Sequence, residues 1–104
     1  VIEGLGVGDT INISGLANMT FADGALTSVG TAYLAAVANT ARLVQGTYAT
    51  NAFTAGAAAT DIDYLFQYAG GAAATDINTI ILEDVGAGTL TAATVSATEV
   101  ITLA

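Results

Sequence analysis

The sequence predicts a mainly β domain, either an antiparallel β-sandwich or a β-roll-like fold, with one short helix at residues 27–41. Several short segments alternate between apolar and polar residues, which is the period of a half-buried strand. Glycine- and aspartate-containing turn signals separate these segments. The chain has 104 residues, of which 54% are hydrophobic, and this suits one domain over residues 1–104 with a modest core.

The N-terminal segment, VIEGLGVGDTINISGL, predicts a strand, a turn and a second strand. Gly6 and the pair Gly8–Asp9 supply the turn, and Ile11 and Ile13 alternate with polar residues in the second strand. A further turn is predicted at Asp23–Gly24.

The helix is predicted from the spacing of apolar residues in LTSVGTAYLAAVANTA. These residues are Leu26, Val29, Tyr33 and Val37. The alanines between them favour a helix, and Thr27 or Ser28 can act as its N-cap. Gly30 opposes it by about 1 kcal/mol relative to alanine.

The rest of the chain has β character. RLVQGTY and AFTA flank residues 49–51 and predict a hairpin. In DIDYLFQY, one face of a strand carries Ile62, Tyr64, Phe66 and Tyr68, and the alternation favours an antiparallel strand with one better-buried side. Residues 80–82 form a continuous apolar run, typical of a strand covered on both faces. After a turn at Gly86–Gly88, TVSATEVITLA predicts a final strand.

The charge composition excludes several classes of function. The net charge is −8, and only one residue, Arg42, is basic, so the chain has no cationic surface for nucleic acid or for an anionic membrane. No apolar run is long enough to span a bilayer. Cysteine and histidine are absent, and no catalytic motif is present, so we expect the chain not to be an enzyme. We expect Arg42 to pair with a carboxylate.

The heptapeptide GAAATDI occurs twice, at residues 56–62 and 71–77. One interpretation is that each copy connects strands, because its small residues and glycine precede a strand-like segment. The other is a cation site, because hard cations such as Ca²⁺ bind six to eight oxygen ligands. The candidate ligands are Asp61, Asp63, Asp76, Asn78, Glu83 and Asp84. Asp61 and Asp63 are two residues apart on a predicted strand, so both can reach one ion. The loop motifs of EF-hands and calcium β-rolls are absent.

Two terminal segments resemble a known family. VIEGLGVGDTINISGL is similar to the strand that follows the calcium repeats of RTX proteins, and TLTAATVSATEVITLA resembles the C-terminus of Caulobacter-type RTX S-layer proteins. Between them, LVQGTYATNAFT, DIDYLFQYAGG and NTIILEDV look like the hairpin-rich part of such C-terminal modules. The resemblance implies a secreted bacterial structural module, exported by a type I system and often ordered by calcium. The calcium-binding nonapeptides of the family are missing from this chain.

These observations lead us to expect an extracellular or cell-surface module, in agreement with its acidic, lysine-free composition, and the C-terminal part of a longer chain. We expect it to self-assemble into a surface layer or filament through strand edges, since lysine and proline, which protect edges, are absent. The candidate assembly residues are Val95, Val100, Ile101 and Leu103. The alternatives are a monomeric, calcium-stabilised secretion-signal module and an accessory domain of a secreted hydrolase.

Overall fold

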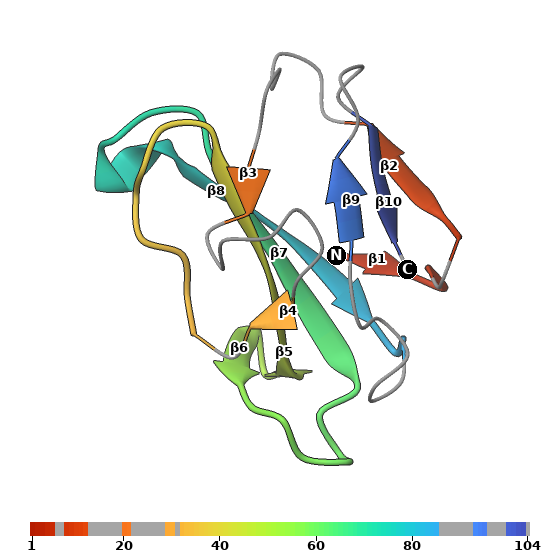
Figure 1. The fold of residues 1–104 in the computed structure, drawn as a ribbon. Coiled ribbons are helices and arrows are strands. Elements are labelled where there is room, and N and C mark those ends of the chain that lie inside the picture. The colour runs from red at the N-terminus through yellow and green to blue at the C-terminus, as the bar shows by residue number, and fades with distance from the viewer. Residues whose placement is uncertain are drawn as a thin grey trace.

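The computed structural model describes residues 1–5, 8–12, 20–21, 29–30, 32–85, 93–95 and 100–103. Strands dominate this part of the chain (Figure 1), so the prediction of a mainly β fold is confirmed. The turns predicted at Asp23–Gly24 and Gly86–Gly88 lie outside the described residues. Among the described residues, no helix has the length and apolar character needed to cross a membrane.

Seven strands form the larger of two sheets. They are β1 (Ile2–Glu3), β3 (Thr20–Phe21), β4 (Val29–Gly30), β5 (Thr40–Ala49), β6 (Ala52–Ala55), β7 (Asp63–Ala69) and β8 (Ile77–Glu83). Their order is β1-β8-β7-β5-β3, and β4 and β6 also pair with β5. The central ladders, β5 with β7 and β7 with β8, are antiparallel. The short strands β1, β3 and β4 pair in parallel, so the sheet is mixed.

The long strand β5 organises the larger sheet. β7 pairs along one edge, and β3, β4 and β6 pair in succession along the other. At Gly46, where β6 begins to pair, a Cβ atom would overlap the Thr54 carbonyl oxygen and the Phe53 ring. Glycine is therefore required for this close approach of the two backbones.

The β5–β6 connection is the hairpin predicted from the sequence. Its two turn residues, Thr50 and Asn51, have φ of 55° and 58°. Positive φ at both central residues is the mark of a type I′ turn, whose twist matches that of the flanking strands. Asparagine tolerates this conformation well, whereas a β-branched threonine is unusual there.

The smaller sheet has three strands, β2 (Thr10–Asn12), β9 (Ala93–Val95) and β10 (Val100–Leu103), with β10 in the middle. Both of its ladders are antiparallel. The strand predicted around residues 10–14 is confirmed over β2. The single final strand predicted at TVSATEVITLA is wrong in one respect, because this segment contains parts of two strands, β9 and β10, which pair antiparallel with each other. The smaller sheet therefore joins a segment near the N-terminus to one near the C-terminus.

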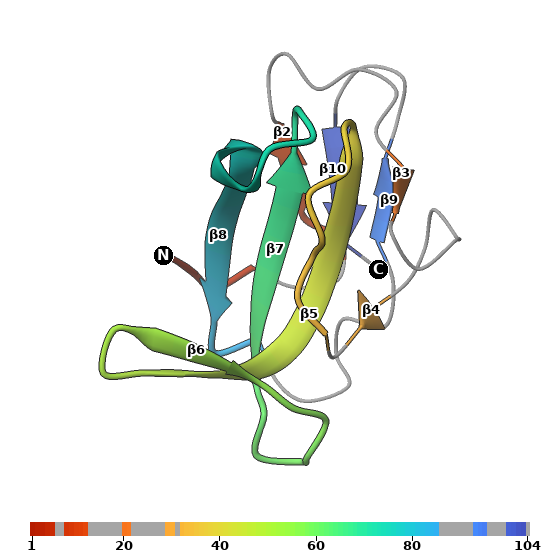
Figure 2. The same ribbon diagram turned by 90° about the vertical axis from the view of Figure 1, so that its left-hand side faces the viewer.

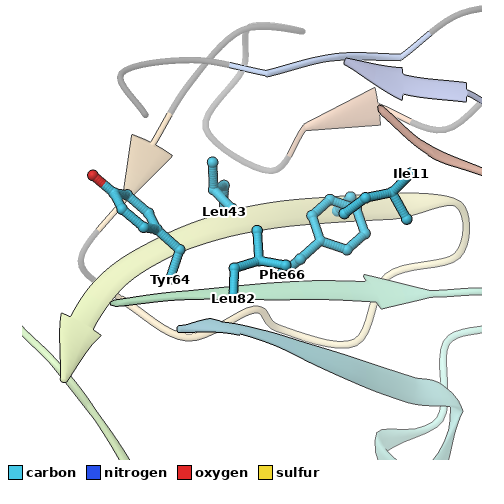
Figure 3. Packing of buried hydrophobic residues seen from close by; sticks show 6 residues of the cluster. Ile11, Leu43, Tyr64, Phe66 and Leu82 are labelled. Carbon is cyan, nitrogen blue, oxygen red and sulfur yellow. The ribbon is translucent and has the colours of Figure 1, made fainter. Parts of the chain in front are cut away.

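The core lies between the two sheets (Figure 3). Its buried members are Ile11, Ala41, Leu43, Tyr64, Phe66 and Leu82. Ile11 is the contribution of β2, whereas the other five side chains come from β5, β7 and β8 of the larger sheet. This two-layer packing is the arrangement of a β-sandwich, and burial of these side chains is its main source of stability.

The opposite face of the larger sheet is also covered. Residues 32–39 run along β5 on this face (Figure 2), and we call them the covering segment. Leu34 of the covering segment is buried, and its N–H donates to Oε1 of Gln67 on β7 (2.8 Å). Arg42 Nη1 donates to the carbonyl oxygens of Ala32 (3.0 Å) and Tyr33 (3.1 Å). Val44 and Leu65, on the same face of the sheet, are buried as a result.

The helix predicted at residues 27–41 is wrong wherever the structure describes that range. Val29 and Gly30 form β4, the covering segment is not helical, and β5 starts at Thr40. The predicted apolar stripe is not buried either, because Tyr33 and Val37 are 51% and 55% exposed. The main-chain groups of the covering segment bond instead to side chains of the sheet, so tertiary contacts override the local helix preference.

Candidate functional site

The two copies of the repeated heptapeptide form the same turn. In the first, Asp61 N–H donates to the Ala58 carbonyl oxygen (3.0 Å), and Asp61 Oδ2 accepts from Ala58 N–H (2.7 Å). In the second, the corresponding distances between Asp76 and Ala73 are 2.9 Å and 3.0 Å. The first copy connects β6 to β7, and the second connects β7 to β8 through the 3₁₀-helix η1 (Ala74–Asp76). The interpretation as a connection between strands is therefore confirmed.

The glycine that opens each copy has a steric role in the turn. A Cβ atom on Gly56 would overlap the Asp61 carboxylate, and one on Gly71 would overlap the Asp76 carboxylate. Each carboxylate thus lies against the bare Cα of the residue five positions earlier. In each copy, the aspartate carboxylate therefore occupies the space that a side chain at the glycine position would need.

Asp61 makes additional contacts with β5. Its Oδ1 accepts from Thr47 Oγ1 (2.8 Å), and its main-chain carbonyl accepts from Gln45 Nε2 (2.9 Å). Gly56 N–H donates to the Gln45 carbonyl oxygen (3.0 Å). Hydrogen bonds therefore join both ends of the first turn to β5.

Asp63, the first residue of β7, is a buried carboxylate with 4% exposure. Its Oδ2 accepts from Tyr48 N–H (2.7 Å), and its Oδ1 accepts from Asp84 N–H (2.8 Å). Two charge-assisted hydrogen bonds offset the loss of solvation of the charge. Asp63 thereby links the end of β5 to the residue that follows β8, where Asp84 has a φ of 58°.

Asp76 and Asn78 belong to a separate and more exposed region. Asn78 Nδ2 donates to the Asp76 carbonyl oxygen (3.2 Å), a contact within the same loop. Asn78 is exposed and Asp76 is half-buried. The second turn therefore depends on local hydrogen bonds.

Glu83 lies at the opposite end of β8, among like charges. β1 pairs in parallel with β8, and this register places Glu3 beside Glu83. Partial desolvation, together with the negative charges of Glu3, Asp84 and Asp63, raises the pKa of the Glu83 carboxyl above its ordinary value. This end of the strand is thus an acidic cluster with mutual repulsion.

The predicted calcium ligands divide into these two regions. β7 and β8 are antiparallel, so Asp63 and Glu83 lie at one end of the pair, and Asp76 and Asn78 lie at the other. At about 3.3 Å per residue, the two ends of a seven-residue strand are about 20 Å apart, which is too far for one ion.

The residues nearest to one another have their carboxylates engaged. Each of the four carboxylate oxygens of Asp61 and Asp63 accepts a hydrogen bond from the chain. Within the described ranges, no group of three or more acidic side chains is arranged to hold a metal ion. Calcium binding stays a prediction. The same part of the chain contains no pocket, and the expectation that the chain is not an enzyme also stays a prediction.

The candidate assembly residues lie in the smaller sheet: Val95 on β9, and Val100, Ile101 and Leu103 on β10. Ile101 pairs with Ile11 on one side and with Val95 on the other. A neighbouring chain would have to displace β2 or β9 before it could pair with β10. Assembly at these four residues stays a prediction: Val100, Ile101 and Leu103 lie on the middle strand of the smaller sheet, whereas Val95 lies on β9, one of its edge strands.

The larger sheet has a strand that is paired on one side only over part of its length, β8. β7 pairs with one side of this strand from Ile77 to Leu82, whereas β1 pairs with the other side only at Leu82 and Glu83. Among the described residues, Ile77–Ile80 therefore have no strand partner on that side. The sequence could have indicated this strand edge, since INTIIL is uncharged, proline-free and rich in β-branched residues. The prediction that residues 80–82 are covered on both faces holds for Leu82, which is buried, whereas Ile80 and Ile81 are only half-buried.

Comparisons with protein-family models, with curated proteins and with solved structures found no match to this chain.

Proposed function

We propose that the chain is an extracellular bacterial structural module that is exported by a type I system and self-assembles through strand edges into a surface layer or filament. The observation that carries the proposal is that, among the residues that the structure describes, β8 has a strand partner on only one side over Ile77–Ile80. Unpaired main-chain N–H and C=O groups along a strand form a template for a strand from another chain. The export route rests on the resemblance of the terminal segments to RTX modules.

The composition near this edge supports the proposal. Monomeric proteins commonly protect an edge strand with lysine, proline or an inward-pointing charge. This chain has no lysine and no proline, and the residues Ile77–Ile80 of this edge carry no charge. Acidic residues stand only at its limits, Asp76 before it and Glu83 after it.

The roles of three aspartate carboxylates agree with a structural module. Asp61, Asp63 and Asp76 all accept hydrogen bonds from main-chain N–H groups, and they thereby hold turns and strand ends in place. Such contacts stiffen the connections between strands, which suits a building block that must keep one shape in an assembly.

The proposal is tested by negative-stain electron microscopy and sedimentation velocity of the purified chain, with millimolar calcium and with a chelator. Ordered sheets or fibres in either condition support the proposal, and assembly that requires calcium also supports a metal site on this chain. A monodisperse monomer at every protein concentration in both conditions would overturn it. That result would favour the monomeric secretion module, for which export of a fused cargo is the direct assay.

A further inference from the structure

The covering segment, residues 32–39, lies on the larger sheet with little burial of its own (Figure 2). None of its residues belongs to a strand or a helix. Leu34 is buried and Ala36 is half-buried, whereas the other six residues are exposed. Segments with few buried apolar side chains open locally at a lower free energy than the whole fold unfolds. The covering segment therefore has the properties of a separate opening unit.

Two side chains of the larger sheet hold this segment in place. Arg42 Nη1 donates to the carbonyl oxygens of Ala32 and Tyr33, and Gln67 Oε1 accepts from Leu34 N–H. Arg42 and Gln67 are opposite each other in the β5–β7 register, so they are neighbours on the covered face. Hydrogen bonds from a charged donor and to a buried N–H are stronger than average. We call Arg42 and Gln67 the latch.

Both ends of the covering segment are fixed. Just before it, β4 pairs with β5, where Gly30 is opposite Val44. At its end, Asn39 N–H donates to the Ala69 carbonyl oxygen of β7 (2.8 Å). Asn39 has a φ of 58°, and the chain enters β5 at the next residue, Thr40. The segment can therefore lift from the sheet between two fixed ends, in the manner of a strap.

Opening of the covering segment would expose an apolar surface and leave the core intact. Val44 and Leu65 lie on the covered face and are 0% and 5% exposed. The core is on the other face, where the two sheets pack together. Opening would also break the exposed hydrogen bond from Tyr33 Oη to the Phe53 carbonyl oxygen (2.9 Å). The packing between the sheets involves none of these contacts.

We propose that the covering segment is a strap that opens while both sheets stay folded, and that Arg42 and Gln67 hold it closed. The opened chain presents Val44 and Leu65 to solvent, so the strength of the latch sets how often this apolar surface is accessible. The inference goes beyond the proposed function and does not depend on it, because it concerns a single copy of the chain.

Residue-resolved hydrogen exchange of the full chain, at a protein concentration too low for assembly, tests the strap. The Leu34 amide measures opening of the segment, and the amides in the β5–β7 ladder measure opening of the sheet. We expect Leu34 to be protected, but to exchange about tenfold or more faster than the most protected ladder amides. Low concentrations of urea should leave the Leu34 rate nearly unchanged and speed exchange in the ladder, because opening of the strap exposes little surface.

Two results of this measurement would overturn the inference. If Leu34 and the ladder amides exchange at the same rate and respond equally to urea, the segment opens only when the sheet unfolds. If the Leu34 amide has no protection, the segment is not held closed and the latch does not exist. Both results come from the wild-type chain, so they do not depend on whether a variant folds.

Arg42→Met tests the latch and leaves Gln67 in place as the acceptor for Leu34 N–H. Methionine keeps an unbranched side chain, but it cannot donate to the carbonyl oxygens of Ala32 and Tyr33. The closed strap loses these hydrogen bonds, whereas the opened strap does not make them. We therefore expect the Leu34 amide to exchange about tenfold faster. An unchanged Leu34 rate would show that Arg42 does not hold the segment.

Asp61→Ala is the matched control, at a site that opening of the strap does not touch. Its lost hydrogen bonds are with Thr47 and Ala58. The closed and opened forms lose these bonds equally, whereas the unfolded chain does not contain them. Exchange in the ladder should therefore become faster while the Leu34 rate stays at its wild-type value. A Leu34 rate that rises as much as the ladder rates would mean that the segment and the sheet open together.

Proteolysis provides a second measurement. Arg42 is the only basic residue, so trypsin has a single site, which lies within β5. Chymotrypsin, which prefers large apolar residues, can cleave after Tyr33 or Leu34 in the strap. With rates normalised to those of the urea-unfolded chain, we expect chymotrypsin to cleave at these residues under conditions in which trypsin leaves the chain intact. Equal normalised rates at Leu34 and Arg42 would overturn the inference.

Discussion

The first and second copies of GAAATDI are identical in sequence and form the same turn, but their surroundings differ. Both aspartates close the turn onto the alanine three residues earlier. Asp61 also accepts a hydrogen bond from Thr47 on β5, whereas the other contact at Asp76 is from Asn78 in its own loop. Local chemistry thus sets the shape of the turn, and the neighbouring strand sets how strongly the turn contributes to the fold.

The largest expected difference between the copies is at the aspartates. Asp61→Ala removes two charge-assisted hydrogen bonds and leaves the half-buried Thr47 hydroxyl without this acceptor, so we expect the free energy of unfolding to fall by about 2–4 kcal/mol. Asp76→Ala removes only the exposed hydrogen bond from Ala73 N–H to the carboxylate, which resembles an N-cap contact. We therefore expect the free energy of unfolding to fall by about 1 kcal/mol. Urea unfolding followed by tyrosine fluorescence, at protein concentrations too low for assembly, measures both.

Thr47→Val provides the control for this difference. It should be destabilising in the wild type and nearly neutral in the Asp61→Ala background, as a double-mutant cycle would reveal. Equal losses for Asp61→Ala and Asp76→Ala would mean that the contact with β5 adds nothing to the first turn.

A smaller effect is expected at the glycines, and here the copies should behave alike. Gly56→Ala and Gly71→Ala each place a methyl group on the carboxylate that closes the turn, so we expect losses of about 1–2 kcal/mol. The penalty should shrink in each double variant that also carries Asp→Ala, because the carboxylate is then gone. An unchanged penalty would show that the glycine is needed for its backbone conformation.

The smallest effect is expected at the end of the strand that follows the second copy. The pKa of Glu83 is raised, so the folded chain holds this proton more tightly than the unfolded chain does. Ionisation of Glu83 therefore lowers stability as the pH rises through its raised pKa, and no penalty remains below the ordinary pKa of about 4.3. Glu83→Gln should stabilise the fold at neutral pH and have little effect at about pH 3.5.

This comparison is made by urea unfolding of both proteins at the two pH values. Glu3→Gln is the matched variant, because it removes one of the charges that raise the Glu83 pKa, and it should give part of the same gain. A stabilisation by Glu83→Gln that is equally large at both pH values would exclude charge repulsion as its cause.

The alternation in DIDYLFQY predicted β7 correctly but only half of its burial. Tyr64 and Phe66 are fully buried, as the apolar face requires. Leu65 and Gln67, on the face predicted to be more open, are 5% and 8% exposed. The covering segment accounts for this burial, and its own sequence suggested a helix. Hydrogen bonds with Arg42 and Gln67 hold the covering segment on the sheet. No local sequence pattern predicts these contacts.

The candidate calcium ligands illustrate the same limit. Six acidic and amide residues within 24 positions suggested one site, but a strand pair about 20 Å long separates them. Proximity in sequence gives proximity in space only within a turn, as at Asp61 and Ala58. Across a hairpin, the register of the two strands decides which residues meet.

The sequence by itself determined the β class, the hairpin around residues 49–51 and the role of the repeat as a connection between strands, because each depends on alternation or on turn residues a few positions apart. The tertiary structure alone decided which face of the larger sheet residues 32–39 cover, the hydrogen bonds between the first turn and β5, and the unpaired side of β8. These features depend on which strands become neighbours. That choice is made by packing of the whole core between residues as distant as Ile11 and Leu82, so no short window of sequence contains it.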